Sequence, residues 1–186
     1  MSLADFEARY RVDPDPWGYA TSDYERDKYE ATLAACGAGP FTEALELGAS
    51  IGVFTELLAS RCERLTTIDG APTAVLAARR RLAAVAHVDT LVGEIPDAIP
   101  IRRFDLVVAS EILYYLTAGE LALTLARIES SMVPRGRLVA VHWRPAGPER
   151  PLDADQVHTI LCGQPWLAPV STGGTDDYRL DVMERL

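Results

Sequence analysis

The fold of this chain is decided by the stretch Ala44-Leu45-Glu46-Leu47-Gly48-Ala49-Ser50-Ile51-Gly52. Its first four residues form a short, mainly apolar run that is typical of a buried parallel strand. Gly48 then permits a positive φ or the close passage of a ligand over bare backbone. Residues 53–58 continue with apolar side chains at helical spacing. A strand, a glycine turn and a helix in this order predict a site for the polar part of a nucleotide-like ligand, because the helix offers its N-terminal amides and the positive end of its dipole.

The glycine pattern of this turn differs from the dinucleotide-binding fingerprint G-x-G-x-x-G. Ser50 stands where that fingerprint has its middle glycine, and Gly52 follows only two residues later. The pattern is therefore E-x-G-x-S-x-G, which is not the dinucleotide-binding motif. A glycine-rich turn with a purely structural role is the alternative interpretation.

Length and composition predict one ordinary globular domain. The chain has 186 residues, 48% hydrophobic and 24% charged, with a formal net charge of −9. This charge argues against a nucleic-acid partner, because phosphate neutralisation requires clustered Lys and Arg side chains. The sequence has no long apolar stretch and no leader-like N-terminus, so we expect no membrane contact and a cytoplasmic protein, as a monomer or homodimer. Three scattered cysteines, Cys36, Cys62 and Cys162, predict neither a disulfide framework nor a metal site.

Strand and helix patterns alternate along the rest of the chain. Two capping boxes, Ser22 to Glu25 and Thr117 to Glu120, predict the starts of helices that end near residues 36 and 132. A further helix is expected over 74–84 and a short one over 153–162, with a turn at 134–137. Strands are expected over 44–47, 65–69, 88–92, 104–109, 138–141, 166–171 and 178–184, the last two joined by a link at 172–175. The alternation predicts an α/β doubly wound sheet, whose ligands lie beyond the carboxyl ends of the strands.

Acidic residues follow two of these strands at positions where they can contact a nucleoside. Asp69 ends the second strand and can accept hydrogen bonds from both ribose hydroxyls, although a buried structural acid is the rival interpretation. Glu94 and Ile95 follow the third strand, where the carboxylate can accept from an exocyclic amine and the Ile95 amide can donate to a ring nitrogen. A solvent-facing loop acid is the alternative at position 94.

With these features in place, the chain resembles the class I S-adenosylmethionine-dependent methyltransferases over its whole length. Within that class, the segments 15–19 and 22–29, together with Ser110-Glu111 and Tyr114-Tyr115-Leu116, are similar to the NodS-like nodulation methyltransferases. Proteins of that family N-methylate the free amine of a deacetylated chitooligosaccharide. Ser50 departs from the glycine most common in the motif, and it fits if it only donates its backbone amide and hydroxyl.

The resemblance implies a seven-stranded, Rossmann-like sheet with strand order 3-2-1-4-5-7-6, in which strand 7 is antiparallel. It implies a single domain over 1–186, with an N-terminal helical lid at 1–37, a cofactor-binding core at 38–144 and a C-terminal helix and strand pair at 145–186. It also implies S-adenosylmethionine as cofactor, with Lys28 pairing with its methionine carboxylate. The residues expected to bind the cofactor are Trp17, Lys28, Tyr29, Glu46, Gly48, Ser50, Asp69, Gly70, Glu94, Ile95 and Ser110.

The expected chemistry is methyl transfer, for which the protein mainly has to place a nucleophile in line and exclude water. Side chains after strands four and five should face the methyl group. His142, with an ordinary pKa around 6.5, suits a general base; Glu111 suits the orientation of an ammonium group; Tyr114 suits the lining of the pocket. Each also has a structural alternative: Glu111 as a cap, Tyr114 as core, and His142 as packing at a strand end.

The sequence therefore predicts methyl transfer to a small polar acceptor, an amine in the first instance and an amino sugar as one form of it. An O-methyltransferase and a non-catalytic protein that binds S-adenosylmethionine are the alternatives. A nicotinamide-dependent oxidoreductase is disfavoured by Ser50. No metal site is expected.

Overall fold

A computed structural model describes residues 1–145 and 147–186. They form a seven-stranded sheet with order β3-β2-β1-β4-β5-β7-β6. In chain order, the elements are α1 (Leu3–Val12), α2 (Asp23–Cys36), β1 (Ala44–Leu47), α3 (Val53–Ala59), β2 (Leu65–Asp69), α4 (Pro72–Arg81), β3 (Val88–Val92), β4 (Phe104–Ser110), the 3-10 turn η1 (Leu113–Tyr115), α5 (Ala118–Ser131), β5 (Met132–Trp143), α6 (Ala154–Cys162), β6 (Leu167–Gly174) and β7 (Tyr178–Arg185). The predicted fold class and strand order are confirmed.

The register of the sheet brings several strand ends to one edge. β1 is paired in parallel with β2 on one side and β4 on the other, with Leu47 opposite Ile68 and Ala109. β7 runs antiparallel to both β5 and β6. The carboxyl ends of β1, β2 and β4 therefore meet, as the alternation of strands and helices predicts.

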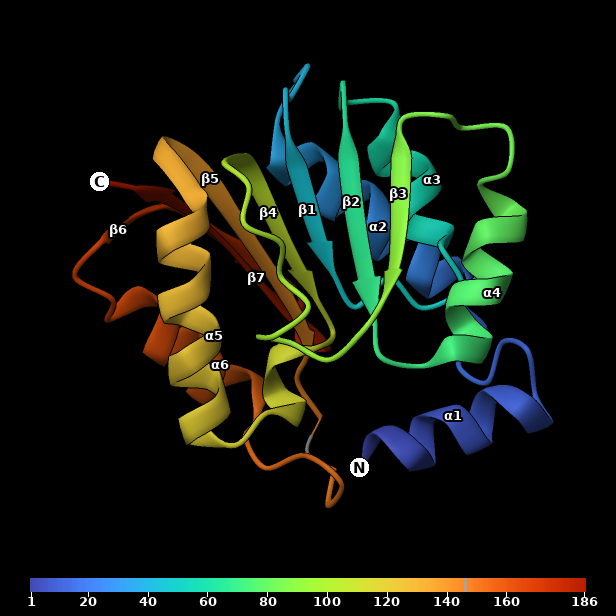
Figure 1. Cartoon of the computed structure of the whole chain (residues 1–186). Helices are drawn as coiled ribbons and strands as arrows, with labels where there is room; N and C mark the ends of the chain where they lie inside the picture. The colour runs from blue at the N-terminus through green and yellow to red at the C-terminus, as the bar shows by residue number, and fades with distance from the viewer. Residues whose placement is uncertain (146) are drawn as a thin grey trace.

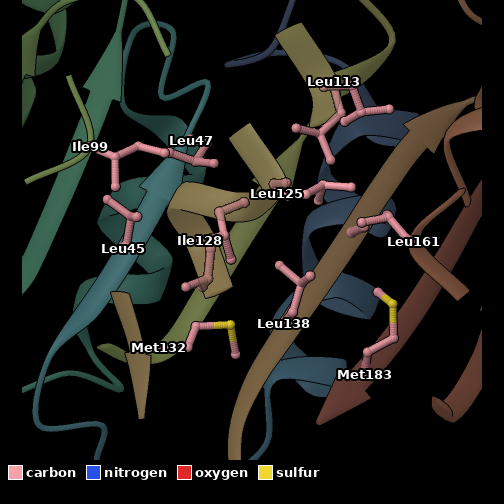
Figure 2. Packing of buried hydrophobic residues seen from close by; sticks show 14 of the residues in the cluster. Leu45, Leu47, Ile99, Leu113, Leu125, Ile128, Met132, Leu138, Leu161 and Met183 are labelled. Atoms are coloured by element: carbon pink, nitrogen blue, oxygen red, sulfur yellow. The ribbon is translucent and has the colours of Figure 1, made fainter. Parts of the chain in front are cut away.

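Both faces of the central strands β1 and β4 are buried, which explains why these strands are mainly apolar. Figure 1 shows α5 and α6 on one face and α2 and α3 on the other. On the α5 side, Leu45 and Leu138 pack with Leu125 and Ile128 of the helix (Figure 2). The opposite face buries a second apolar cluster that includes Phe54 of α3. Along β4 the side chains alternate between the two clusters, as expected for a strand covered on both sides.

Two stretches differ from the expectation drawn from sequence. The turn expected at 134–137 lies inside β5, which begins at Met132 and pairs with Phe104 before its register shifts. Arg135 has a φ of 63° there, so these residues form a bulge that does not end the strand. Similarly, β6 extends through Gly174, which leaves only residues 175–177 to link it to β7.

The N-terminal segment contains a helix, α1, that the sequence analysis missed. Ser2 caps it, and Ser2 and Asp5 form a complete capping box. Figure 1 places α1 across the edge of the sheet where β1, β2 and β3 end. At α2, by contrast, the expected capping box is only half formed: Ser22 accepts from the Glu25 amide, while the Glu25 side chain contacts Lys28 instead. Among the described residues, no helix combines the length and apolar character needed to cross a bilayer.

Candidate functional site

A cavity of about 330 Å³ lies at the carboxyl ends of β1, β2 and β4 and is lined in part by residues of α1. Its volume falls at the lower end of the range usual for small-molecule sites. Eleven of the fourteen side chains predicted from the sequence line it: Trp17, Tyr29, Glu46, Gly48, Ser50, Asp69, Gly70, Glu94, Ile95, Ser110 and Glu111. Lys28, Tyr114 and His142 lie outside this lining.

The glycine turn after β1 is shaped by close backbone contact. Gly48 has a φ of 85°, and a Cβ at this position would lie 2.7 Å from the carbonyl oxygen of Ser110. Ser50 and Gly52 also have positive φ values, of 49° and 79°. A side chain at position 48 would both strain the backbone and fill the space where the ends of β1 and β4 approach one another. The turn therefore exposes bare backbone to the cavity.

Asp69 connects the end of β2 to this turn. Its Oδ2 accepts a hydrogen bond from the Ser50 amide at 2.8 Å, and its Oδ1 accepts one from the Ala71 amide at 2.9 Å. Burial raises the pKa of the carboxyl above its ordinary value, and the two amide hydrogen bonds oppose this rise. Each oxygen retains capacity for a further donor, so the carboxylate can hold the turn and still accept from hydroxyl groups of a ligand.

Glu46 is a second buried carboxyl group at the cavity floor. It is 1% exposed, and its Oε2 accepts from the hydroxyls of Thr55 at 2.6 Å and Thr67 at 2.7 Å. Burial raises the pKa of this carboxyl to about 7, against the opposing effect of the two hydroxyl hydrogen bonds. A positively charged ligand group placed beside Glu46 would favour its ionised form.

Gly93, Glu94 and Ile95 form the end of the cavity that follows β3. Gly93 donates its amide to the carbonyl of Asp69 at 3.0 Å, and a Cβ on Gly93 would lie 2.6 Å from the Cβ of Ala98. Glu94 and Ile95 follow immediately and line the cavity. This arrangement suits a flat ring, which the exposed amides and carbonyls of an irregular segment can hydrogen-bond at its edge.

Aromatic side chains close the cavity from above. Trp17 stacks with Tyr19 at a centroid distance of 5.8 Å and meets Tyr10 edge-on at 5.4 Å. Phe6 packs edge-on against Tyr115 at 4.8 Å. Phe6 and Tyr10 are lining residues that the sequence analysis missed, because α1 itself was missed. The capping box of Ser2 and Asp5 was the available signal.

Polar contacts hold α1 in this position. The Glu7 carboxylate accepts from the amide and the hydroxyl of Thr73 at the start of α4, at 3.0 and 2.7 Å. The Tyr10 hydroxyl lies 2.5 Å from Oγ of Ser50 in the glycine turn. Leu3 packs so closely on Gly70 that a Cβ there would lie 2.7 Å from its Cδ1. The cavity is thus covered by an element tied to both β1–α3 and β2–α4 connections.

Glu111 stands at the opposite side of the cavity, with a φ of 55°. Its Oε1 accepts from Lys28 Nζ at 2.7 Å, and its Oε2 accepts from the Trp143 amide at 2.9 Å and from the Tyr114 hydroxyl. Helix α2, strand β5 and the turn after β4 each contribute one donor. The carboxylate is therefore fixed in orientation before any ligand arrives.

Lys28 has different partners from those expected. Its side chain is 2% exposed, and Nζ lies between Glu111 and Glu25, 3.0 Å from Oε2 of the latter. Burial alone would lower the pKa of this amine, but the two carboxylates outweigh it and the pKa is raised. With Nζ held between these two groups, the structure does not bring Lys28 to the cavity, where a methionine carboxylate would lie.

Tyr114 and His142 are also placed differently from the prediction. Tyr114 is 4% exposed, and its ring packs against His142 at 5.0 Å. His142 is fully buried; Nε2 is 3.2 Å from the Leu113 amide and Nδ1 is 3.0 Å from Nε2 of His158. Burial, with His158 next, lowers the pKa of His142 well below 6.5. Both ring nitrogens are engaged away from the cavity, so we do not assign His142 as a general base.

Comparison with known proteins finds relatives that match up to about three quarters of the chain. A family model described as Nodulation protein S (NodS) matches residues 5–144. Nodulation protein S of Rhizobium tropici is 36% identical over 138 residues, which are 73% of this chain and 58% of that protein. The corresponding protein of Sinorhizobium fredii (strain NBRC 101917 / NGR234) is 34% identical over 127 residues, which are 67% of this chain and 59% of that protein. The chain thus spans less than two thirds of the length of these curated relatives.

A solved structure matches over a longer range. It is that of the N-methyltransferase NodS from Bradyrhizobium japonicum WM9 in complex with S-adenosyl-L-homocysteine. The two chains superpose with a TM-score of 0.89 at 28% sequence identity, covering 100% of this chain and 99% of the other. The fold described above is therefore shared in full with that protein.

Proposed function

Because the chain belongs to the NodS family, we propose that it transfers the methyl group of S-adenosylmethionine to an amine of a small polar molecule. The support comes from a solved relative and from this chain itself. The similar structure from Bradyrhizobium japonicum is described as an N-methyltransferase and holds S-adenosylhomocysteine. The residues of this chain also form a cavity suited to that cofactor, with the features set out below.

The cavity fits the three parts of S-adenosylmethionine. The bare backbone at Gly48, which a Cβ would fill, suits the methionine portion. Asp69 suits the ribose hydroxyls, and the segment at Glu94 and Ile95 suits the adenine edge. Glu46 lines the same cavity as this turn and can compensate an ammonium group there. When bound, the cofactor supplies an electrophilic methyl group on a positively charged sulfur.

Charge favours a cationic ligand in this cavity. The Asp and Glu side chains among the described lining residues are Glu46, Asp69, Glu94, Glu111 and Glu120, and none of the described lining side chains is Lys or Arg. The aromatic faces of Trp17 and Tyr19 add attraction for cations. Such a lining favours a sulfonium and an ammonium over neutral or anionic groups.

Glu111 is the observation that carries the choice of an amine over a hydroxyl acceptor. Its carboxylate lines the cavity and is fixed by three donors, and Oε1 accepts only from Lys28 among the described residues, which leaves room for one further donor. An ammonium group can fill that position. Glu111 would hold the acceptor nitrogen and stabilise its positive charge, while the aromatic cover excludes water from the reacting atoms.

The proposed roles of the chain's residues follow from this geometry. The acceptor nitrogen gives up one proton to solvent as it enters, which frees the lone pair that forms the new N–C bond as the C–S bond breaks; Glu111 then faces the positive charge that develops on the nitrogen. Glu111 positions the nitrogen, and Tyr114 and Lys28 position Glu111. Orientation of this kind supplies a large part of the rate enhancement in a reaction with an already reactive electrophile. The segment 1–37 serves as the lid over the cofactor.

For the acceptor we propose a small polar amine, of which an amino sugar is one form, as the family resemblance implies. The test compares glucosamine with glucose, since the two differ only in having an amine or a hydroxyl at one carbon. We expect calorimetry to detect binding of S-adenosylmethionine and mass spectrometry to detect N-methylated glucosamine. Methylation of glucose alone would favour an O-methyltransferase. Cofactor binding without turnover of either sugar or of a wider amine panel would favour a non-catalytic binding protein.

A substitution at Glu111 tests the same proposal from the protein side. Glu111→Gln keeps the shape of the side chain and removes its charge, so it should lower kcat/KM for the amine at least tenfold, because an ion pair with the ammonium is lost. The dissociation constant of S-adenosylhomocysteine should change little. Glu149→Gln, an exposed acid on the loop after β5, is the control. Unchanged amine turnover in Glu111→Gln would contradict the role of Glu111.

A further inference from the structure

The turn after β4 builds the acceptor side of the cavity. Glu111, Ile112, Tyr115 and Leu116 all line it, and they lie within or beside the short turn η1. At the centre of this turn, the Leu113 amide points to a side chain, Nε2 of His142, at 3.2 Å. The position of four lining residues thus depends on a contact made on the far side of the turn.

His142 begins a chain of buried polar groups that leads away from the cavity. Its Nδ1 lies 3.0 Å from Nε2 of His158, and Nδ1 of His158 lies 2.8 Å from Oδ2 of Asp181. All three residues are at most 1% exposed. Asp181 Oδ2 also accepts from Nε of Arg179 at 3.0 Å, which anchors the end of the chain on β7.

Donors and acceptors in this chain fit together in one direction. The Leu113 amide can only donate, so Nε2 of His142 must accept and the ring proton must lie on Nδ1. That proton is donated to Nε2 of His158, whose own proton on Nδ1 is donated to Asp181. Burial keeps His142 neutral by lowering its pKa. The contacts with His158 and Asp181 therefore fix which ring nitrogen of His142 accepts from Leu113.

Building on the methyl-transfer function proposed above, we propose that His142 is a positioning residue: through the Leu113 amide it holds the turn that places Glu111 and Tyr115 at the acceptor side of the cavity. His158 and Asp181 set the orientation of its ring. The contact with Tyr114 strengthens the link, because Tyr114 packs on the His142 ring and donates its hydroxyl to Glu111. The cofactor side, at Ser50 and Asp69, is built by other strands.

Two substitutions at His142 separate its contact with the Leu113 amide from its contact with His158. The side-chain oxygen of Gln reaches the position of Nε2 and can accept from Leu113, whereas the amide of Asn reaches only the position of Nδ1 and can contact only His158. We expect His142→Gln to stay within a few fold of the native kcat/KM for the amine, and His142→Asn to lose about tenfold or more. Neither should change the dissociation constant of S-adenosylhomocysteine. His87→Asn, at an exposed histidine beyond α4, is the control.

Hydrogen exchange of the Leu113 amide provides a readout that is independent of turnover. We expect protection of this amide to persist in His142→Gln and to fall in His142→Asn. Nitrogen NMR of the native protein should show neutral rings protonated on Nδ1 for His142 and His158. Equal kcat/KM in the two variants, equal Leu113 protection, or a proton on Nε2 of His142 would each overturn the positioning role. If the native protein binds the cofactor but methylates no amine, the proposed function fails and the acceptor role falls with it, while Leu113 exchange still tests the hold on the turn.

Discussion

At the scale of single residues, Asp69 links two functions that the sequence offered as alternatives. It ends β2 beside the cavity, as a ribose-binding acid would, and it also fixes the glycine turn through the Ser50 amide. The rival interpretation of a buried structural acid is thus compatible with ligand binding, because each carboxylate oxygen accepts one backbone donor and keeps room for another.

We expect Asp69→Ala to weaken binding of S-adenosylhomocysteine at least tenfold. Charge-assisted hydrogen bonds contribute roughly 1.5–3 kcal/mol each, and about 1.4 kcal/mol corresponds to tenfold. Calorimetry provides the measurement, and Asp27→Ala, an exposed acid on α2, is the control. An affinity equal to that of the native protein would rule out the ribose role.

Gly48 has a positive φ and also lines the cavity, so a side chain at this position affects both the backbone and the bound ligand. Gly48→Ala would bring a Cβ to 2.7 Å from the Ser110 carbonyl at a φ of 85°. We expect it to lower the free energy of unfolding by about 1–3 kcal/mol, as for other strained backbone positions, and to weaken cofactor binding. Gly119→Ala is the matched control, since a Cβ there meets no atom within 4 Å and alanine favours a helix. Denaturant unfolding of both variants checks the difference, and equal stability would contradict the close approach.

At the scale of elements, the sequence predicted the strands better than the ends of the chain. β1, β2 and β3 match the predicted ranges because their apolar runs are bounded by glycine, acids or polar loops. The cavity-lining residues followed from this, since parallel strands bring their carboxyl ends together. α1 was missed because its apolar residues do not gather on one face of the helix, and only Tyr10 among them is buried. The stretch 134–137 was predicted as a turn but forms a bulge. Both features favour glycine and residues with positive φ, such as Gly136 and Arg135 here, so the sequence does not distinguish them.

The placement of His142, Lys28 and Tyr114 could not be predicted for a related reason. Strand ends indicate which residues lie near the cavity, but not which way each side chain points. His142, the next-to-last residue of β5, contacts His158 of α6. Lys28 contacts Glu25, which lies one turn earlier on α2. These partners depend on helix packing, which the sequence pattern leaves open.

Helix α1 closes the cavity, and its contact with the glycine turn is testable. Tyr10→Phe removes the hydroxyl that lies beside Ser50, so it should weaken S-adenosylhomocysteine binding several fold, since a neutral hydrogen bond contributes about 0.5–1.5 kcal/mol. Stopped-flow dissociation should show faster release. Tyr24→Phe is the matched control, because the Tyr24 hydroxyl is buried without a hydrogen-bond partner among the described residues. Identical release rates in the two variants would count against the tie between α1 and the turn.

At the scale of the whole molecule, Glu46 makes stability depend on pH. Its pKa rises from 4.5 in the unfolded chain to about 7 in the folded one. The folded state therefore favours the protonated form, so this contribution to stability is fully present below pH 4.5 and is lost as the pH rises through about 7. Relative to Glu46→Gln, the native protein should lose melting temperature between about pH 4.5 and 7. A melting-temperature difference that stays constant over this range would contradict the raised pKa.

The sequence pattern predicted a doubly wound sheet, but it did not predict the order of the strands within that sheet. Alternating strands and helices indicated a doubly wound sheet, but the order β3-β2-β1-β4-β5-β7-β6 came from the family resemblance. Hydrophobic periodicity does not say where a strand is inserted. The antiparallel β7 between β5 and β6 is such an insertion.

Lys28 is the only lysine in the sequence, and its side chain is 2% exposed between two carboxylates. Acylating reagents that attack ε-amines therefore find no accessible target on the native molecule apart from the chain terminus. Modification at this single position would mark only molecules that have opened, so the chain carries its own chemical reporter of unfolding.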